Sequence, residues 1–75
     1  AQTTPDWWPA SIPDSMAGRD VVAVRPLASF NHPDGRAVVI HAVKDEQGNY
    51  WRVLVDANAV VRDGDTLTVQ PSAMP

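Results

Sequence analysis

Turn motifs at regular spacing are the feature that most constrains the fold of this chain. Between residues 20 and 70, runs of β-branched and aromatic residues alternate with Pro-Asp-Gly at residues 33–35, a polar stretch at residues 45–49, and Asp-Gly at residues 63–64. Pro fixes φ, Asp bonds to nearby backbone N–H groups, and Gly accepts a positive φ. Short strands separated by such turns predict an all-β domain.

The predicted strands are rich in Val, Ile and aromatic residues, as strands in folded proteins are. They lie at residues 20–27, 37–44, 50–55 and 65–70, with residues 59–61 as a shorter fifth. The stretch 37–44 is almost continuously apolar, which predicts a central strand that is covered on both faces.

The turns and one proline predict how the strands connect. Because Pro26 has no N–H, we expect it at an edge, at a bulge or at the end of the first strand. We predict that the strand ends there and that residues 29–36 form a loop or a wide hairpin connection. The polar stretch 45–49 predicts a hairpin between the second and third strands, and Asp63-Gly64 between two apolar runs predicts another.

Alternate residues of the third strand form two different faces. One face carries no charge and is assigned to the core: Trp51, Val53 and Val55. The other face combines an aromatic, a cationic and an aliphatic side chain, a composition typical of protein interfaces. We expect it to point outward, and it comprises Tyr50, Arg52 and Leu54.

Four or five short antiparallel strands are too few for a two-sheet sandwich. A small, highly curved barrel of the SH3-like or OB-like sort hides strand edges and is therefore the predicted fold. The chain has 75 residues and no cysteine. A single core of this size rarely supplies more than about 3–5 kcal/mol of stability. We therefore expect one domain, to which self-association or a larger partner adds stability.

The first residues differ from the rest of the chain. Residues 1–19 hold three of the seven prolines and two of the three tryptophans, without strand or helix periodicity. We predict an extended N-terminal arm over residues 1–19 with at most one helical turn, a β-barrel domain over residues 20–70, and a flexible tail over residues 71–75.

Adjacent Trp7 and Trp8 are the first candidates for docking onto a partner. The flanking Pro5 and Pro9 favour extended conformations that lose little entropy on binding, and tryptophan is enriched at interface hot spots. In the alternative, one or both rings fold back as a lid over the open end of the chain's own small barrel. The candidate partner-binding residues are Trp7, Trp8, Pro9, Ile12, Tyr50, Arg52 and Leu54.

Catalytic and metal-binding patterns are weak. His32 lies beside Asp34 in a predicted turn, where a solvated loop residue is expected. His41 lies in an apolar strand, where a hydrogen-bonded, half-buried histidine or a residue at a subunit contact is expected. Two histidines without a second pair of ligands do not make a zinc site. Asp63 and Asp65 around Gly64 lack the further oxygen ligands that calcium needs. We expect no catalytic residue, metal or cofactor.

Charge also bears on the partners. Nine acidic and six basic residues give a net charge of −3, and the cations are scattered along the sequence. Because no basic stripe is present, nucleic acid is not an expected partner. No apolar run approaches the length of about 18 residues that a membrane-spanning helix requires, so no membrane insertion is expected.

These patterns favour a non-catalytic protein-interaction or assembly subunit of a larger complex or virion. It would dock through its N-terminal arm and one face of the barrel. A small regulatory or inhibitory binder of a partner protein is the alternative. A second alternative is a ligand-binding or oligomeric enzymatic β-barrel that uses His32, His41 or the turn containing Asp63 and Asp65.

Overall fold

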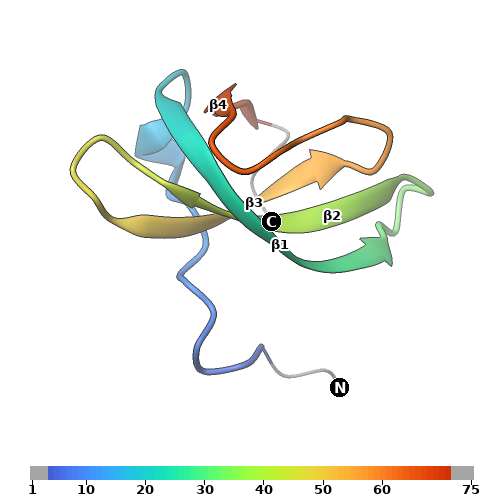
Figure 1. Cartoon of the computed structure of the whole chain (residues 1–75). Coiled ribbons are helices and arrows are strands. Elements are labelled where there is room, and N and C mark those ends of the chain that lie inside the picture. Colours follow the sequence, from blue (N-terminus) through green and yellow to red (C-terminus); the bar gives the residue numbers. More distant parts are fainter. Residues whose placement is uncertain (1–3, 72–75) are drawn as a thin grey trace.

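A single antiparallel sheet of four strands forms the body of the molecule (Figure 1). The computed structural model describes residues 4–71, and within that range it contains no α-helix. The elements are the 3-10 turn η1 (Asp14–Met16) and the strands β1 (Asp20–Asn31), β2 (Ala37–Lys44), β3 (Tyr50–Asp56) and β4 (Thr66–Thr68). The sheet order is β3-β2-β1-β4, and the sheet is strongly curled into a half-barrel. The predicted all-β class is confirmed.

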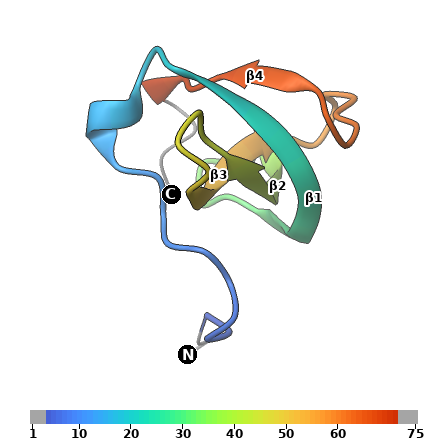
Figure 2. The same ribbon diagram turned by 60° about the vertical axis from the view of Figure 1, so that its left-hand side comes forward.

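The curl follows the long strand β1, which sweeps from β4 to the far end of β2 (Figure 2). Its register against β2 shifts between Ala23 and Arg25 and again between Pro26 and Ala28. Such bulges increase strand twist and accommodate a residue without an N–H. The bulge at Pro26 is therefore confirmed, but the predicted strand end is wrong. Residues 29–31 of the predicted loop belong to β1.

The hairpin between β2 and β3 is confirmed. Strand β2 has the predicted bounds, and β3 extends one residue further than predicted, to Asp56. The Asp45 N–H donates to the Asn49 carbonyl oxygen at 2.9 Å, which closes the turn. Trp51 is half-buried, and its indole Nε1–H donates to the Asp45 carboxylate at 2.8 Å.

The predicted second hairpin is wrong, because β4 pairs with β1 and not with a neighbour in sequence. Residues 59–61 form no strand, and the side chain of Val60 is 80% exposed. The Asp63-Gly64 turn does form, but the Gly64 N–H donates to the Ala23 carbonyl oxygen at 2.9 Å. Pairing with a distant strand thus overrides the local hairpin pattern.

The core lies on the inner face of the curled sheet, which we define as the face that carries the largest apolar cluster. This cluster consists of Ile12, Val21, Val43, Val53 and Val69, with Met16, Trp51, Val55 and Leu67 packed against it. The assignment of Trp51, Val53 and Val55 to the core face is therefore confirmed. Val43, on the central strand β2, is completely buried.

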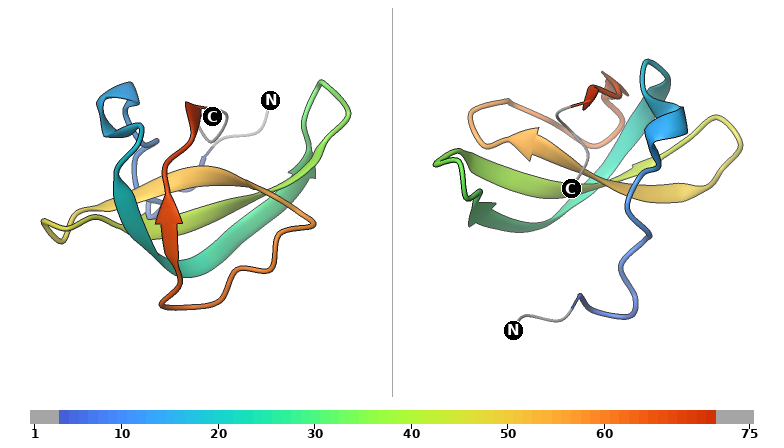
Figure 3. Two further views of the ribbon diagram at one scale, coloured as in Figure 1. Left: turned by 90° about the horizontal axis from the view of Figure 1, so that it is seen from above. Right: turned by 180° about the vertical axis from the view of Figure 1, so that it is seen from behind.

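Residues 4–13, called here the N-terminal segment, run along the opposite side of the sheet from β4 before they reach its edge (Figure 3). Ser11 forms a parallel bridge with Arg52 of β3. The Arg52 N–H donates to the Ala10 carbonyl oxygen at 2.9 Å, and the Ile12 N–H donates to the Arg52 carbonyl oxygen at 3.1 Å. The segment therefore wraps around the β3 edge and inserts Ile12 into the core.

Parts of the predicted arm and tail, residues 1–3 and 72–75, lie outside the described residues. Within the described part of the chain, no helix has both the length and the apolar character needed to cross a membrane.

Candidate functional site

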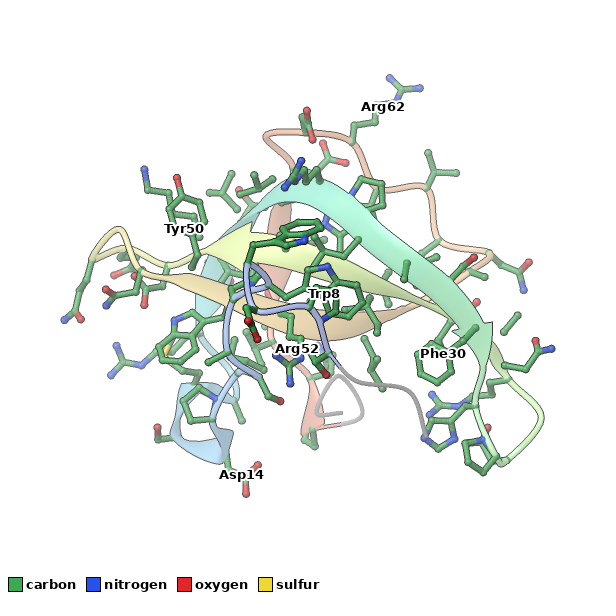
Figure 4. All side chains as sticks on the ribbon, turned by 90° about the horizontal axis from the view of Figure 1, so that it is seen from below. Trp8, Asp14, Phe30, Tyr50, Arg52 and Arg62 are labelled. Atoms are coloured by element: carbon green, nitrogen blue, oxygen red, sulfur yellow. The ribbon has the colours of Figure 1, made fainter. Side chains whose placement is uncertain are left out.

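The outer face of the sheet, opposite the core cluster, is more covered than alternation along the strands predicts. Strand pairing places Tyr50 opposite Lys44, and Leu54 opposite Ile40. Leu54, expected to point outward into solvent, is only 7% exposed. The alternation of side chains along β3 predicts which face Leu54 is on, but not whether another segment covers that face. The N-terminal segment crosses this face (Figure 4).

Arg52 anchors the N-terminal segment on this face. Besides its two backbone bonds to the segment, its Nη1 donates to the Pro9 carbonyl oxygen at 2.7 Å. The side chain is half-buried, and because a guanidinium presents several donors in a rigid plane, it loses little freedom in holding a carbonyl group. Arg52 therefore acts as the clamp that positions the residues before Pro9.

Trp8 lies over the middle of the sheet, between Tyr50 and Phe30 (Figure 4). It is half-buried, and its Nε1 atom is buried without a hydrogen-bond partner among the described residues. A buried donor without a partner costs about 1–3 kcal/mol. One of the two tryptophans thus folds back onto the chain's own sheet. Trp8 covers the outer face of the sheet, however, and not the open end of the barrel as the lid alternative predicts.

Trp7 and Tyr50 are exposed aromatic residues, each with a cation over its ring. Trp7 is 64% exposed, and the guanidinium carbon of Arg25 lies 5.1 Å from its ring centroid. Tyr50 is 53% exposed, and Lys44 Nζ lies 5.6 Å from its centroid. Trp7 also meets Trp8 edge to face, with 6.2 Å between the ring centroids. These contacts hold both rings in defined positions on the surface.

A groove of about 340 Å³ lies between the N-terminal segment and the outer face of the sheet. Its lining is mostly apolar and aromatic and comprises Trp7, Pro9, Val24, Arg25, Leu27, Ala42 and Tyr50. Within residues 4–71 the ion pairs involve only Asp34, with His32 and Arg36. Arg25, which lines the groove, and Lys44, which lies over the Tyr50 ring, therefore have no carboxylate partner there. The groove thus combines apolar walls with local positive charge on a chain of net charge −3.

The structure separates the predicted partner-binding residues into three groups. Trp7, Pro9 and Tyr50 line the groove. Trp8 belongs to the N-terminal segment and lies over the middle of the sheet, and Arg52 holds the segment through Pro9. Ile12 and Leu54 are buried, so neither side chain is accessible to a partner.

Sequence reasoning missed the part of the groove that β1 and β2 contribute: Val24, Arg25, Leu27 and Ala42. The two register shifts around Pro26 interrupt the period of two along β1. No simple alternation therefore assigns these residues of β1 to a face, and only the presence of Pro26 indicates that alternation fails here.

The two histidines occupy separate environments. His41 is only 4% exposed, and its Nδ1 lies 3.0 Å from the carbonyl oxygen of Ala42, so it is more deeply buried than expected. His32 lies at the turn after β1, 3.2 Å from Asp34. The Arg36 backbone N–H, followed by its guanidinium, lowers the pKa of the Asp34 carboxyl. The contacts of Asp34 with His32 and Arg36 close this turn. Within residues 4–71, no group of three or more metal-ligating side chains occurs.

Comparisons of the chain with protein-family models, with curated proteins and with solved structures found no match.

Proposed function

We propose that this chain is a non-catalytic protein-interaction or assembly subunit, which docks into a larger complex or virion through its N-terminal segment and the outer face of its sheet. The observation that carries this proposal is the groove between two exposed aromatic rings, Trp7 and Tyr50. Exposed tryptophan that is already held in place loses little conformational entropy when a partner covers it. Such residues dominate the binding energy of many interfaces.

The occupant that we propose for the groove is an extended segment of a partner protein. Its apolar side chains would contact Val24, Leu27 and the two aromatic rings, and its carboxylates would meet Arg25 and Lys44. The volume of the groove lies at the lower end of the roughly 300–1,000 Å³ typical of binding pockets. The cations without carboxylate partners supply the charge complementarity, which favours an acidic segment.

We also propose that the half-barrel belongs to the small barrels of the SH3-like or OB-like sort. The short strands, the strong curl and the bulged β1 support this assignment. Aromatic-lined grooves on SH3 domains receive extended peptides, and the groove described here has the same chemical character.

Variant-dependent capture tests the proposal. The full chain and the variants Trp7→Ala, Tyr50→Ala and Val60→Ala are each cross-linked in extracts of the native host, and the captured proteins are identified. Val60 is a matched control, because it is exposed but does not line the groove. We expect one protein to be captured by the wild type and by Val60→Ala and lost from both groove variants. A partner that both groove variants retain would contradict the proposal.

Single substitutions are better suited to this test than removal of the N-terminal residues. A deletion of residues 1–12 would remove Ile12 from the core, so loss of binding would not distinguish docking from unfolding. Circular dichroism of each variant confirms that the sheet is intact.

A further inference from the structure

The open side of the half-barrel contains a second hollow, called here the slot. Its volume is about 250 Å³, and it is lined by Val21, by residues 53–56 of β3 and by residues 67–70, which include the end of β4. Figure 3 shows β4 on this open side, and β1 is the only described strand that pairs with it. The slot shares no lining residue with the groove between Trp7 and Tyr50.

On the β3 side, the slot exposes backbone groups that have no partner within residues 4–71. The N–H and C=O of Arg52 both point away from β2, because both bond to the N-terminal segment. Backbone groups two residues apart in a strand point the same way, so those of Leu54 also point away from β2. The N-terminal segment pairs with β3 only at Arg52, and no described residue pairs with Leu54 at this edge.

The β4 side presents a matching edge. The Val69 N–H donates to the Arg19 carbonyl oxygen at 2.8 Å, and the Val69 carbonyl oxygen accepts from the Gly18 N–H at 2.8 Å. Val69 therefore directs its backbone groups towards the chain that leads into β1. The same alternation turns the N–H and C=O of Thr68 towards the slot. Among residues 4–71, no group pairs with Thr68 on this side, so two unpaired strand edges border one apolar hollow.

We propose that the slot is a strand-acceptor site for an extended segment of a partner protein. The incoming strand would bond to Leu54 on one side and Thr68 on the other, and would convert the half-barrel into a closed barrel. Unpaired edges are templates for such pairing, and addition of a strand is a known mode of peptide recognition.

The chemistry of the lining specifies the incoming strand. Val53, Val55 and Leu67 require apolar side chains at the alternate positions that face the hollow. An apolar cavity of about 150 Å³ accommodates benzene, so the slot has room for at least one large apolar side chain. A small apolar ligand would fill the hollow but leave the backbone groups unpaired.

A second copy of the chain does not fit this role. Strands β1 and β2 are paired on both sides in the sheet. The N-terminal segment is bonded to the chain's own β3. Strands β3 and β4 each already pair with one neighbour, so no described strand has two free edges to offer the slot of another copy.

Hydrogen exchange with a defined probe tests the site. The full chain is titrated with a short capped peptide of alternating valine and threonine, with a lysine at each end, and amide exchange is followed by NMR. We expect exchange of the Leu54 and Thr68 amides to slow by about tenfold or more, because each gains an acceptor. A peptide N-methylated at its valines is the control and should give no protection. The Trp7→Ala variant should respond like the wild type, which separates this site from the groove.

A pair of variants at Thr68 isolates the backbone contribution. Thr68→Pro and Thr68→Val both lose the hydroxyl bond to Asp20, but only the proline variant loses the N–H that faces the slot. We expect the probe to bind Thr68→Val as it binds the wild type and to bind Thr68→Pro about two- to tenfold more weakly. If Thr68→Pro does not fold, the amide protection of the wild type decides the question.

Three results would overturn the proposal. The first is unprotected Leu54 and Thr68 amides at millimolar probe. The second is equal protection by the N-methylated peptide, which would indicate a site for apolar ligands. The third is a dimer in light scattering that the probe does not disrupt, which would indicate that a second copy occupies the slot.

Discussion

Asp45 accepts bonds from three donors at the turn between β2 and β3. Its Oδ1 accepts from the N–H groups of Gln47 at 2.8 Å and Asn49 at 2.9 Å, and its Oδ2 accepts from Trp51 Nε1 at 2.8 Å. The Trp51 indole is the main reason that the pKa of the Asp45 carboxyl lies below its ordinary value, and the two backbone N–H groups lower it further. The turn therefore depends on the charged form of one side chain.

This dependence predicts a pH-sensitive contribution to stability. Folding lowers the pKa of Asp45, so the charged carboxylate stabilises the folded protein. This stabilisation is complete above the ordinary carboxyl pKa of about 3.9 and is lost as the pH falls through the lower pKa of the folded state. We expect Asp45→Ala to lower the melting temperature at neutral pH, and its deficit relative to the wild type to shrink in acid. Thermal melts across this pH range measure the effect, with Glu46→Ala as the control. A deficit that stays constant in acid would disprove this role.

The buried indole N–H of Trp8, which has no hydrogen-bond partner within residues 4–71, gives a second prediction. Replacement of the indole N–H by sulfur, with benzothienylalanine at position 8 of a synthetic chain, keeps the ring shape and removes the buried donor. We expect the free energy of unfolding to rise by up to about 1–3 kcal/mol, because the desolvation cost of that donor disappears. Urea denaturation measures this change. A loss of stability would show that Nε1 donates a hydrogen bond in the folded protein.

At the scale of elements, the turn at Gly64 joins the last loop to β1. Gly64 has a φ of +90°, and its N–H bonds to Ala23. An added Cβ would meet no atom within 4 Å, so the cost of a side chain comes from the backbone alone. We expect Gly64→Ala to destabilise the protein by about 1–2 kcal/mol.

A synthetic chain with D-alanine at position 64 is the matched control, because a D-residue adopts this conformation without strain. Urea denaturation of the two chains should therefore give different stabilities. Equal losses from both alanines would mean that the turn does not require a positive φ at this position.

The elements differ in how far the sequence predicts them. The β2–β3 hairpin depends on neighbours in sequence, and residues 37–44 alone define its central strand correctly. The partner of β4 depends on a pairing between Val21 and Leu67, far apart in the chain, which no local pattern encodes. The length of β1 is also not predicted by its local sequence. The bulges around Pro26 allow the strand to stay paired with β2 as far as Asn31.

At the level of the whole molecule, the half-barrel has two hollows with different linings. The groove on the outer face has exposed aromatic rings and cations, and the slot has unpaired backbone and an apolar lining. A core of this size supplies only about 3–5 kcal/mol, so coverage of either surface would add to a small stability. The sequence identified Trp7 and Tyr50 as surface candidates. It could not show that Ile12 passes round the β3 edge into the core, because that depends on the path of the whole segment.

Docking through the outer face is measured by the affinity of the captured partner for three proteins: the wild type, Trp7→Ala and Val60→Ala. Truncation of a hot-spot tryptophan costs 2 kcal/mol or more, which corresponds to a dissociation constant weaker by about thirtyfold. We predict this loss for Trp7→Ala and unchanged affinity for Val60→Ala. Equal affinity of all three proteins for the partner would contradict docking through the outer face of the sheet.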